Sequence, residues 1–143
     1  AASAMEDLTR KLMRIGMDNL YGYVEGVQEW ADSGGQLLRP DIISLRQFED
    51  ILKTNHAQIV DLRGYTEFKA GHIKGAKNIF VGTLENELDR IDRDLPVVIH
   101  CLSGDRASIG YSLLRKHGFR DVKNFSGGIN AWLDAGRPVV KER

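Results

Sequence analysis

The sequence predicts an α/β fold: a mainly parallel sheet of about five strands with helices on both faces, preceded by a helical N-terminal segment. Short apolar runs alternate with helix-like patterns from about residue 41 onward. This alternation is typical of a parallel sheet covered on both sides. The chain has 143 residues, of which 42% are hydrophobic and 28% charged. Such a length and composition suit one globular domain with its own core.

Five short apolar runs are the expected strands. They occupy residues 42–44, 58–62, 76–80, 96–100 and 122–125. Short apolar runs of this kind are typical of buried strands in a parallel sheet. Functional sites in such sheets lie at the carboxyl ends of the strands.

Four helix-like patterns accompany these strands. Ser44 and Gln47 form a possible capping box at the start of the first helix, and Thr83 is placed to cap the second. The apolar positions on these two helices are Phe48, Ile51 and Leu52, and then Leu84, Leu88 and Ile91. The two later helices are expected over residues 107–117 and 129–133. Gly118 suits a left-handed C-cap for the third helix.

Cys101 is the single cysteine of the chain and directly follows the expected strand 96–100. Backbone N–H groups and the positive end of the following helix should converge there, and such a place stabilises an anion. It also favours the thiolate form of a cysteine. A lone cysteine after an apolar strand is usually a small buried hydrophobe. The neighbouring Gly104 and Arg106 favour a nucleophile instead.

Two motifs resemble those of the rhodanese sulfurtransferases, and the likeness covers roughly residues 40–140. One motif is Asp61-Leu62-Arg63, then Glu67-Phe68, then Gly71-His72-Ile73-Lys74-Gly75-Ala76 with Asn78-Ile79. The other is Cys-x-x-Gly-x-Arg from Cys101 to Arg106, followed by Gly127-Gly128-Ile129 and Trp132. The resemblance implies a rhodanese-like domain over residues 39–143. It implies that Cys101 takes a sulfur atom from a donor, becomes a persulfide, and passes the sulfur to a thiol or cyanide without a cofactor or a metal ion.

The resemblance also assigns the other site residues. The active-site loop comprises Leu102, Ser103, Gly104, Asp105, Arg106 and Ala107. The supporting residues are Asp61, Arg63, Glu67 and His72. We expect the first three of these to form an ion-pair network near the loop and His72 to hold its turn. His100 lies within the strand and should point into the core or a neighbouring layer.

The first forty residues repeat the pattern of the C-terminal end of the chain. Gly16, Gly26, Trp30, Asp32 and Gly34 recur 102 residues later as Gly118, Gly128, Trp132, Asp134 and Gly136. Apolar residues recur as well: Met17, Leu20, Tyr23 and Val27 match Phe119, Val122, Phe125 and Ile129. Residues 1–38 are therefore interpreted as a partial or vestigial copy of a rhodanese C-terminal segment plus a linker. The alternative is an unrelated helical extension.

Charge and cysteine content exclude several classes of partner. Lys and Arg together number 20, as do Asp and Glu, and no basic run gives a reason to expect nucleic acid or an anionic membrane. No apolar run approaches the length of a membrane span. One cysteine forms no internal disulfide or multi-cysteine metal site and favours the cytoplasm. The four histidines lack ligand-like spacing.

The loop sequence also predicts a preference among sulfur donors. Leu102 follows the cysteine, Asp105 adds a negative charge, and Arg106 is the one cation of the loop. Thiosulfate is a dianion, so we expect it to be a poorer donor than a small persulfide such as glutathione persulfide.

Two other functions remain open from the sequence. One is a non-catalytic docking or regulatory module within a larger sulfide-detoxification protein. The partial repeat at the start of the chain resembles proteins in which twin rhodanese units follow a metallo-β-lactamase-like persulfide dioxygenase domain. The other is a cysteine-dependent phosphatase. Phosphatase loops have five residues between cysteine and arginine, whereas residues 102–105 number four here.

Overall fold

The computed structural model describes residues 2–23 and 26–142. The chain forms two compact units, the first ending at Leu37 and the second beginning at Leu38. The first unit contains α1 (Ala2–Arg14) and α2 (Gln28–Asp32). The strands of the second unit are β1 (Asp41–Ile42), β2 (Gln58–Asp61), β3 (Lys77–Asn78), β4 (Val97–His100) and β5 (Val122–Asn124). Its helices are α3 (Leu45–Thr54), α4 (Tyr65–Ala70), the 3-10 turns η1 (Val81–Asn86) and η2 (Leu88–Arg90), α5 (Asp105–Lys116) and α6 (Gly128–Asp134).

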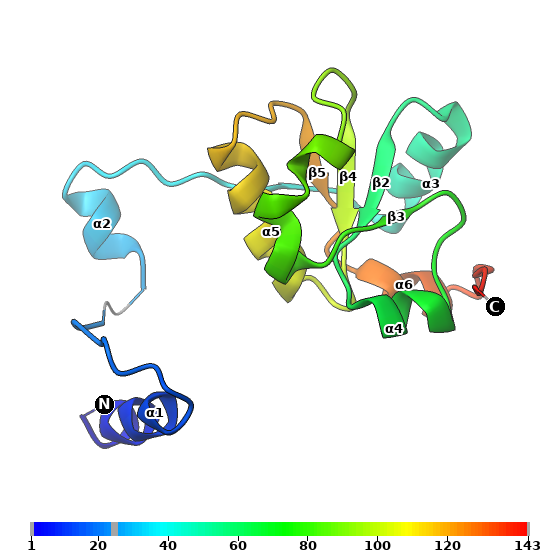
Figure 1. The fold of residues 1–143 in the computed structure, drawn as a ribbon. Coiled ribbons are helices and arrows are strands. Elements are labelled where there is room, and N and C mark those ends of the chain that lie inside the picture. Colours follow the sequence, from blue (N-terminus) through cyan, green and yellow to red (C-terminus); the bar gives the residue numbers. More distant parts are fainter. Residues whose placement is uncertain (1, 24–25, 143) are drawn as a thin grey trace. The chain divides into compact units, whose positions relative to one another are not determined.

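The five strands form one parallel sheet in the order β1-β5-β4-β2-β3 (Figure 1). The predicted α/β class with a parallel sheet of five strands is therefore confirmed. β4 lies at the centre, and its His100 pairs with Asp61 of β2. The carboxyl ends of β2 and β4 consequently lie next to each other, which brings the two sequence motifs to the same edge of the sheet.

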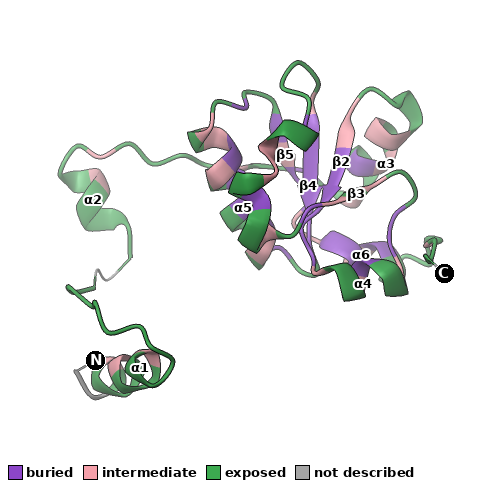
Figure 2. Cartoon of the chain, in the orientation of Figure 1, coloured by how far each residue is buried: buried purple, intermediate pink, exposed green. Residues whose placement is uncertain are grey.

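Alternate residues of the central strands point to opposite faces of the sheet, and both faces are covered. Val60 and Ile99 belong to one core cluster, whereas Ile59 and Val98 belong to the other. On the first face they meet Leu84 of η1 and Ala107, Tyr111 and Leu114 of α5. On the second face they meet Phe48 of α3 and Ile129 and Trp132 of α6. Figure 2 shows the resulting buried band along the central strands.

The local helix signals are confirmed at some positions and wrong at others. The Ser44–Gln47 capping box is present, with the Ser44 N–H donating to the Gln47 side chain at 2.8 Å. Gly118 takes the expected left-handed conformation, with φ +87°. The helix predicted to start at Thr83 is wrong, because residues 81–90 form two 3-10 turns. The Thr83 hydroxyl donates back to the Phe80 carbonyl at 3.3 Å and therefore does not cap a helix.

α4 is a short helix that the sequence patterns did not predict. Its six residues offer too few turns for an apolar periodicity, and Gly64 precedes it where a Ser, Thr or Asp cap would be expected. The Gly64 N–H donates instead to the Glu67 carboxylate at 3.1 Å. This contact stabilises the first turn and fixes the position of Glu67.

The first unit has no buried residue among its described side chains at 4–23 and 26–37 (Figure 2). In α1, the residues of intermediate exposure are Met5, Thr9 and Leu12, which lie on one side of the helix. The derivation of this unit from a second domain copy stays a prediction at this point.

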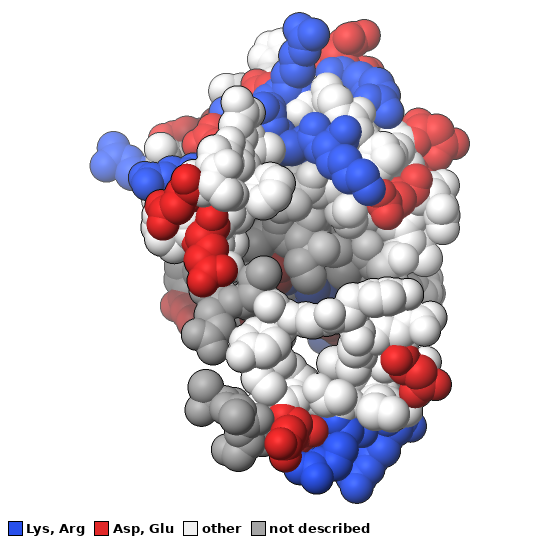
Figure 3. Space-filling model, turned by 90° about the vertical axis from the view of Figure 1, so that its left-hand side faces the viewer, with Lys and Arg blue, Asp and Glu red and all other residues white. Residues whose placement is uncertain are grey.

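The surface carries charges of both signs. Lys and Arg side chains are interspersed with Asp and Glu on the face drawn in Figure 3, in keeping with the equal totals of the composition. Among the described helices, none combines the length and the apolar character that a membrane crossing requires.

Candidate active site

Cys101 lies immediately after β4, and its residue is only 1% exposed. The backbone N–H of Gly104 donates to its Sγ at 3.1 Å. α5 begins at Asp105, two residues before the predicted start, so the positive end of its dipole lies close to the sulfur. The sequence predicts several amides around this sulfur. Within the described chain, one amide makes that contact.

Gly104 allows the tight turn between β4 and α5. Its φ is +113°, a left-handed conformation that residues with a side chain rarely adopt. A Cβ atom at this position would lie 2.8 Å from the Ser126 carbonyl oxygen. The loop therefore requires glycine for two separate reasons, and the turn carries the Gly104 amide to the sulfur.

Two backbone hydrogen bonds join α6 to the cysteine loop. The Ile129 N–H donates to the Cys101 carbonyl at 3.0 Å, and the Asn130 N–H donates to the Leu102 carbonyl at 3.2 Å. At Gly128, φ is +58° and a Cβ atom would lie 2.5 Å from the Cys101 carbonyl oxygen. Sequence reasoning noted this glycine as part of a motif but missed its role in holding the cysteine loop.

The remaining loop residues divide between rim and core. Leu102 is 40% exposed, and Ser103 and Asp105 are also exposed. Ala107 is fully buried in the core against the sheet. The side chain of Leu102 thus offers an apolar surface beside the cysteine, and the carboxylate of Asp105 faces solvent.

Arg106 pairs with Glu67 of α4 through two hydrogen bonds. Its Nη1 donates to Oε2 at 2.6 Å, and its Nη2 donates to Oε1 at 2.9 Å. The hydrogen bond from Arg106 is the main cause that lowers the pKa of Glu67; burial opposes it, and the Gly64 amide adds to the lowering. The Glu67 carboxylate in turn raises the pKa of Arg106, as does the nearby Cys101. Both terminal nitrogens of the guanidinium are therefore bound to Glu67.

Asp61 and Arg63 form a second, deeply buried ion pair. The side chains are 0% and 5% exposed, and Nη2 of Arg63 lies 2.6 Å from Oδ2 of Asp61. The Arg63 Nε donates to the same carboxylate at 2.9 Å, and Nη2 also donates to the Gly71 carbonyl at 2.8 Å. This pair fixes the segment after β2. It makes no hydrogen bond to the Cys101 loop among the described residues.

His72 contacts Phe68 and Val140 at the turn that follows α4. Its Nδ1 lies 2.9 Å from the Phe68 carbonyl, and its ring stacks on the Phe68 ring at a centroid distance of 3.6 Å. Its backbone exchanges two hydrogen bonds with Val140 at 2.9 Å each. These contacts tie the end of α4 to the C-terminal segment.

His100 points into the core, as expected from its place in β4, and is fully buried. Its Nε2 lies 3.8 Å from Oδ2 of Asp61. Burial is the main cause that lowers the pKa of His100, and the Asp61 carboxylate only partly offsets it. A neutral imidazole therefore precedes Cys101 in the chain.

Comparison with known proteins identifies the family of the domain. The family description "rhodanese-like domain" matches residues 44–135. YqhL of Bacillus subtilis, an uncharacterized protein, is 37% identical over 76 residues, or 53% of this chain and 60% of YqhL. The thiosulfate sulfurtransferase GlpE of Shewanella oneidensis is 33% identical over 93 residues, or 65% of this chain and 92% of GlpE.

Solved structures show the same fold. A rhodanese-related protein from Thermoplasma volcanium superposes with a TM-score of 0.66 and 25% identity, over 71% of this chain and 99% of the other. The human single-domain sulfurtransferase TSTD1 gives a TM-score of 0.63 and 27% identity, over 68% and 97%. The family match at residues 44–135 spans the Cys101 loop and both ion pairs. The chain therefore belongs to the family of rhodanese-like domains.

Proposed function

We propose that this protein is a sulfurtransferase that moves a sulfane sulfur through a persulfide on Cys101. The observation that carries the proposal is the hydrogen bond from the Gly104 N–H to the Cys101 Sγ at 3.1 Å. Backbone amides stabilise anionic sulfur, and the sulfur that reacts in each step of such a transfer is an anion. The sulfurtransferase names of GlpE and TSTD1 support the same reaction class.

The reaction runs in two balanced steps. In the first, the Cys101 thiolate attacks the outer sulfur of a donor and forms a new S–S bond. The bond between that sulfur and the rest of the donor breaks, and its electron pair leaves as sulfite from thiosulfate or as a thiolate from a persulfide. In the second step, cyanide or an acceptor thiolate attacks the outer sulfur of the persulfide and regenerates the Cys101 thiolate.

The charges around the loop support a small persulfide, or a protein persulfide, as the better donor. Arg106 is the one cation of the loop, and both of its terminal nitrogens bind Glu67. Asp105 adds an exposed negative charge, and Leu102 adds apolar surface. A doubly charged anion gains little from such a mouth. We therefore infer that thiosulfate is a mediocre donor and that glutathione persulfide is used with a higher kcat/KM.

Steady-state kinetics test both statements. Thiocyanate formation is measured with varied donor and cyanide, for thiosulfate and for glutathione persulfide. We expect parallel double-reciprocal lines, the signature of a covalent relay, and no activity in Cys101→Ser. A thiosulfate kcat/KM well above the persulfide value would refute the donor preference alone. Wild-type protein inactive with every donor would instead favour a docking module, and hydrolysis of an aryl phosphate would favour a phosphatase.

The compartment follows from the same chemistry. A persulfide relay on one cysteine needs surroundings in which thiols stay reduced. We therefore propose that the protein works in the cytoplasm.

A further inference from the structure

The first unit exposes the apolar residues that a folded domain would bury. Met17, Leu20, Tyr23, Val27 and Trp30 are 56%, 42%, 57%, 62% and 61% exposed. The residues 102 positions later, Phe119, Val122, Phe125, Ile129 and Trp132, are 2%, 3%, 1%, 2% and 7% exposed. All five of the later residues lie in the two cores of the second unit. The second unit thus shows what would cover the same set of side chains.

The backbone of the first unit repeats that of the second at the same offset. The recurring glycines share left-handed conformations: φ is +82°, +79° and +90° at Gly16, Gly26 and Gly34, and +87°, +58° and +69° at Gly118, Gly128 and Gly136. Sequence likeness alone does not require this agreement. It indicates that the two segments end their helices and turn the chain in the same way.

The hydrogen bonds at these turns repeat as well. Gly16 N–H donates to Met13 and Met17 N–H to Leu12, as Gly118 N–H donates to Arg115 and Phe119 N–H to Leu114. Gly34 N–H donates to Ala31 and Gly35 N–H to Trp30, as Gly136 N–H donates to Leu133 and Arg137 N–H to Trp132. α1 and α2 therefore end in the same way as α5 and α6.

α1 also has the inward and outward faces of α5. The buried positions of α5 are Ala107, Gly110, Tyr111 and Leu114, and their counterparts are Met5, Leu8, Thr9 and Leu12. The exposed positions Ser108, Ile109 and Ser112 correspond to Glu6, Asp7 and Arg10. Charged residues thus occupy the face that α5 turns to solvent, and uncharged residues occupy the face that α5 packs on the sheet.

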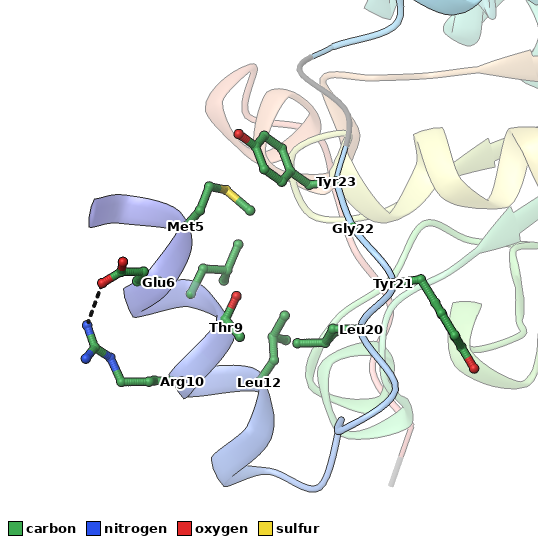
Figure 4. Close-up of a pocket in the computed structure, with 10 residues that line it drawn as sticks. Met5, Glu6, Thr9, Arg10, Leu12, Leu20, Tyr21, Gly22 and Tyr23 are labelled. Carbon is green, nitrogen blue, oxygen red and sulfur yellow. Dashed lines mark ion pairs between the residues drawn. The ribbon is translucent and has the colours of Figure 1, made fainter. Parts of the chain in front are cut away.

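The first unit contains an open groove. It lies between α1 and residues 20–23 and has a volume of about 660 Å³. In Figure 4, Leu12 of α1 and Leu20 point toward each other across one end of the groove. Their counterparts Leu114 and Val122 lie in one core with Ile99 of β4. A central strand is therefore the element that fits this groove.

We propose that residues 2–37 are the C-terminal helix–strand–helix segment of a second rhodanese-like unit, and that the body of that unit covers their apolar face. The body is a sheet and helices equivalent to residues 38–105. Gly26 supports this occupant in particular. Its counterpart Gly128 must be glycine because the Cys101 carbonyl approaches it, and a Cβ would lie 2.5 Å from that oxygen. Gly26 has the same left-handed conformation, which leaves room for the backbone of an equivalent loop in the second unit's counterpart. This inference does not depend on the proposed function.

One residue restricts the body further. Leu8 stands where the second unit has Gly110, and a Cβ at Gly110 would lie 2.3 Å from Cδ1 of Leu62. We therefore expect the body that covers the first unit to carry a side chain smaller than leucine at the position equivalent to Leu62. This requirement separates a matched domain body from a generic apolar partner.

An extended chain tests the proposal. Residues 38–105, carrying Leu62→Ala and Cys101→Ser, are placed directly before Ala4 of the chain, and Trp132→Phe leaves Trp30 as the single tryptophan. We expect hydrogen exchange in residues 20–23 to slow by at least about tenfold and Trp30 emission to shift to shorter wavelength. The matched control keeps Leu62 in the extension and should show weaker protection. Equal hydrogen-exchange rates of residues 20–23 in the extended chain, its control and the chain without an extension would overturn the proposal.

A segment exchange keeps the test decisive if the extended chain does not fold. Residues 118–136 of the full chain are replaced by residues 16–34, with Tyr23→Phe to spare a buried hydroxyl. We expect the exchanged chain to unfold in one cooperative urea transition, with a lower midpoint than the unaltered chain. A second chain, in which the apolar residues of the inserted segment are scrambled while its glycines stay in place, should show no cooperative transition. Loss of the cooperative transition in both the exchanged chain and the scrambled chain would overturn the proposal. So would a dimer of the unaltered chain with residues 4–37 protected, because a second copy would then cover the face.

Discussion

Arg106 and Glu67 join the start of α5 to α4 through two hydrogen bonds of 2.6 and 2.9 Å. Because Arg106 follows Cys101 by five positions, this pair sets the charge next to the proposed nucleophile. Both terminal nitrogens of the guanidinium donate hydrogen bonds to a carboxylate of the protein. The pair therefore explains why a loop with one cation should attract a dianion only weakly.

Removing the charge of Glu67 should release that cation. In Glu67→Gln the amide oxygen can still accept from Gly64, so α4 should persist. We expect kcat/KM for thiosulfate to rise roughly threefold to tenfold at low salt, with a smaller change for glutathione persulfide. Added salt should reduce the gain, because exposed charges are screened.

Glu85→Gln is the control for this effect. Glu85 is an exposed carboxylate that pairs with Lys116 and His117, and it lies outside the cysteine loop. Its substitution should leave both kcat/KM values unchanged. An equal rise in both variants would mean that net charge, and not the Arg106 pair, governs the donor preference.

Gly128→Ala should disrupt the cysteine loop. The added Cβ would press on the Cys101 carbonyl at 2.5 Å in a left-handed conformation. We expect a stability loss of about 3 kcal/mol or more, measured by urea unfolding, together with a large fall in the rate of persulfide formation. Gly136→Ala is matched, since φ is +69° and no atom lies within 4 Å. It should cost only about 1–2 kcal/mol and retain the rate.

Asp61→Asn should destabilise the fold through a charge left alone in the core. Arg63 would keep its buried guanidinium without the carboxylate that now lies 2.6 Å away. Breaking a buried pair on one side typically costs about 3–5 kcal/mol. The double variant Asp61→Leu with Arg63→Met should recover part of that loss. A double variant less stable than Asp61→Asn would contradict this account of the pair.

His100 should make the protein sensitive to mild acid. Burial lowers its pKa from the ordinary 6.5, so the unfolded chain binds a proton at a pH where the folded chain does not. Stability should therefore be complete above about 6.5 and fall as the pH drops toward the folded pKa. Urea unfolding between pH 5 and 8 should show a steeper acid loss for wild type than for His100→Asn. Parallel curves would mean that His100 does not titrate in this way.

The strands and their common edge could be predicted because buried parallel strands leave short apolar runs in the sequence. β1 and β3 were predicted as longer than their two residues each, since apolar flanks such as Ile43 and Ile79 continue the pattern after the pairing ends. The Ser44–Gln47 cap could be predicted because both of its partners lie within one turn. Signals of this kind are local and need no knowledge of the fold.

Contacts between distant segments could not be predicted in the same way. The support of the cysteine loop by Ile129 and Gly128 depends on how α6 meets β4, and a glycine pair alone does not reveal its neighbour. The 3-10 turns at 81–90 replaced a predicted helix because Leu84, Leu88 and Ile91 can reach the core at helical spacing without an α-helix. The Glu67–Arg106 pairing likewise required the register of α4 against α5.

The central claim is that Cys101 accepts and releases one sulfur atom, and intact mass measures this directly. The reduced protein is incubated with glutathione persulfide or thiosulfate, and its intact mass is measured by mass spectrometry before and after addition of cyanide. The account predicts the gain of one sulfur atom in wild type, its removal by cyanide, and no gain in Cys101→Ser. An unchanged wild-type mass with both donors, or the same gain in Cys101→Ser, would contradict it.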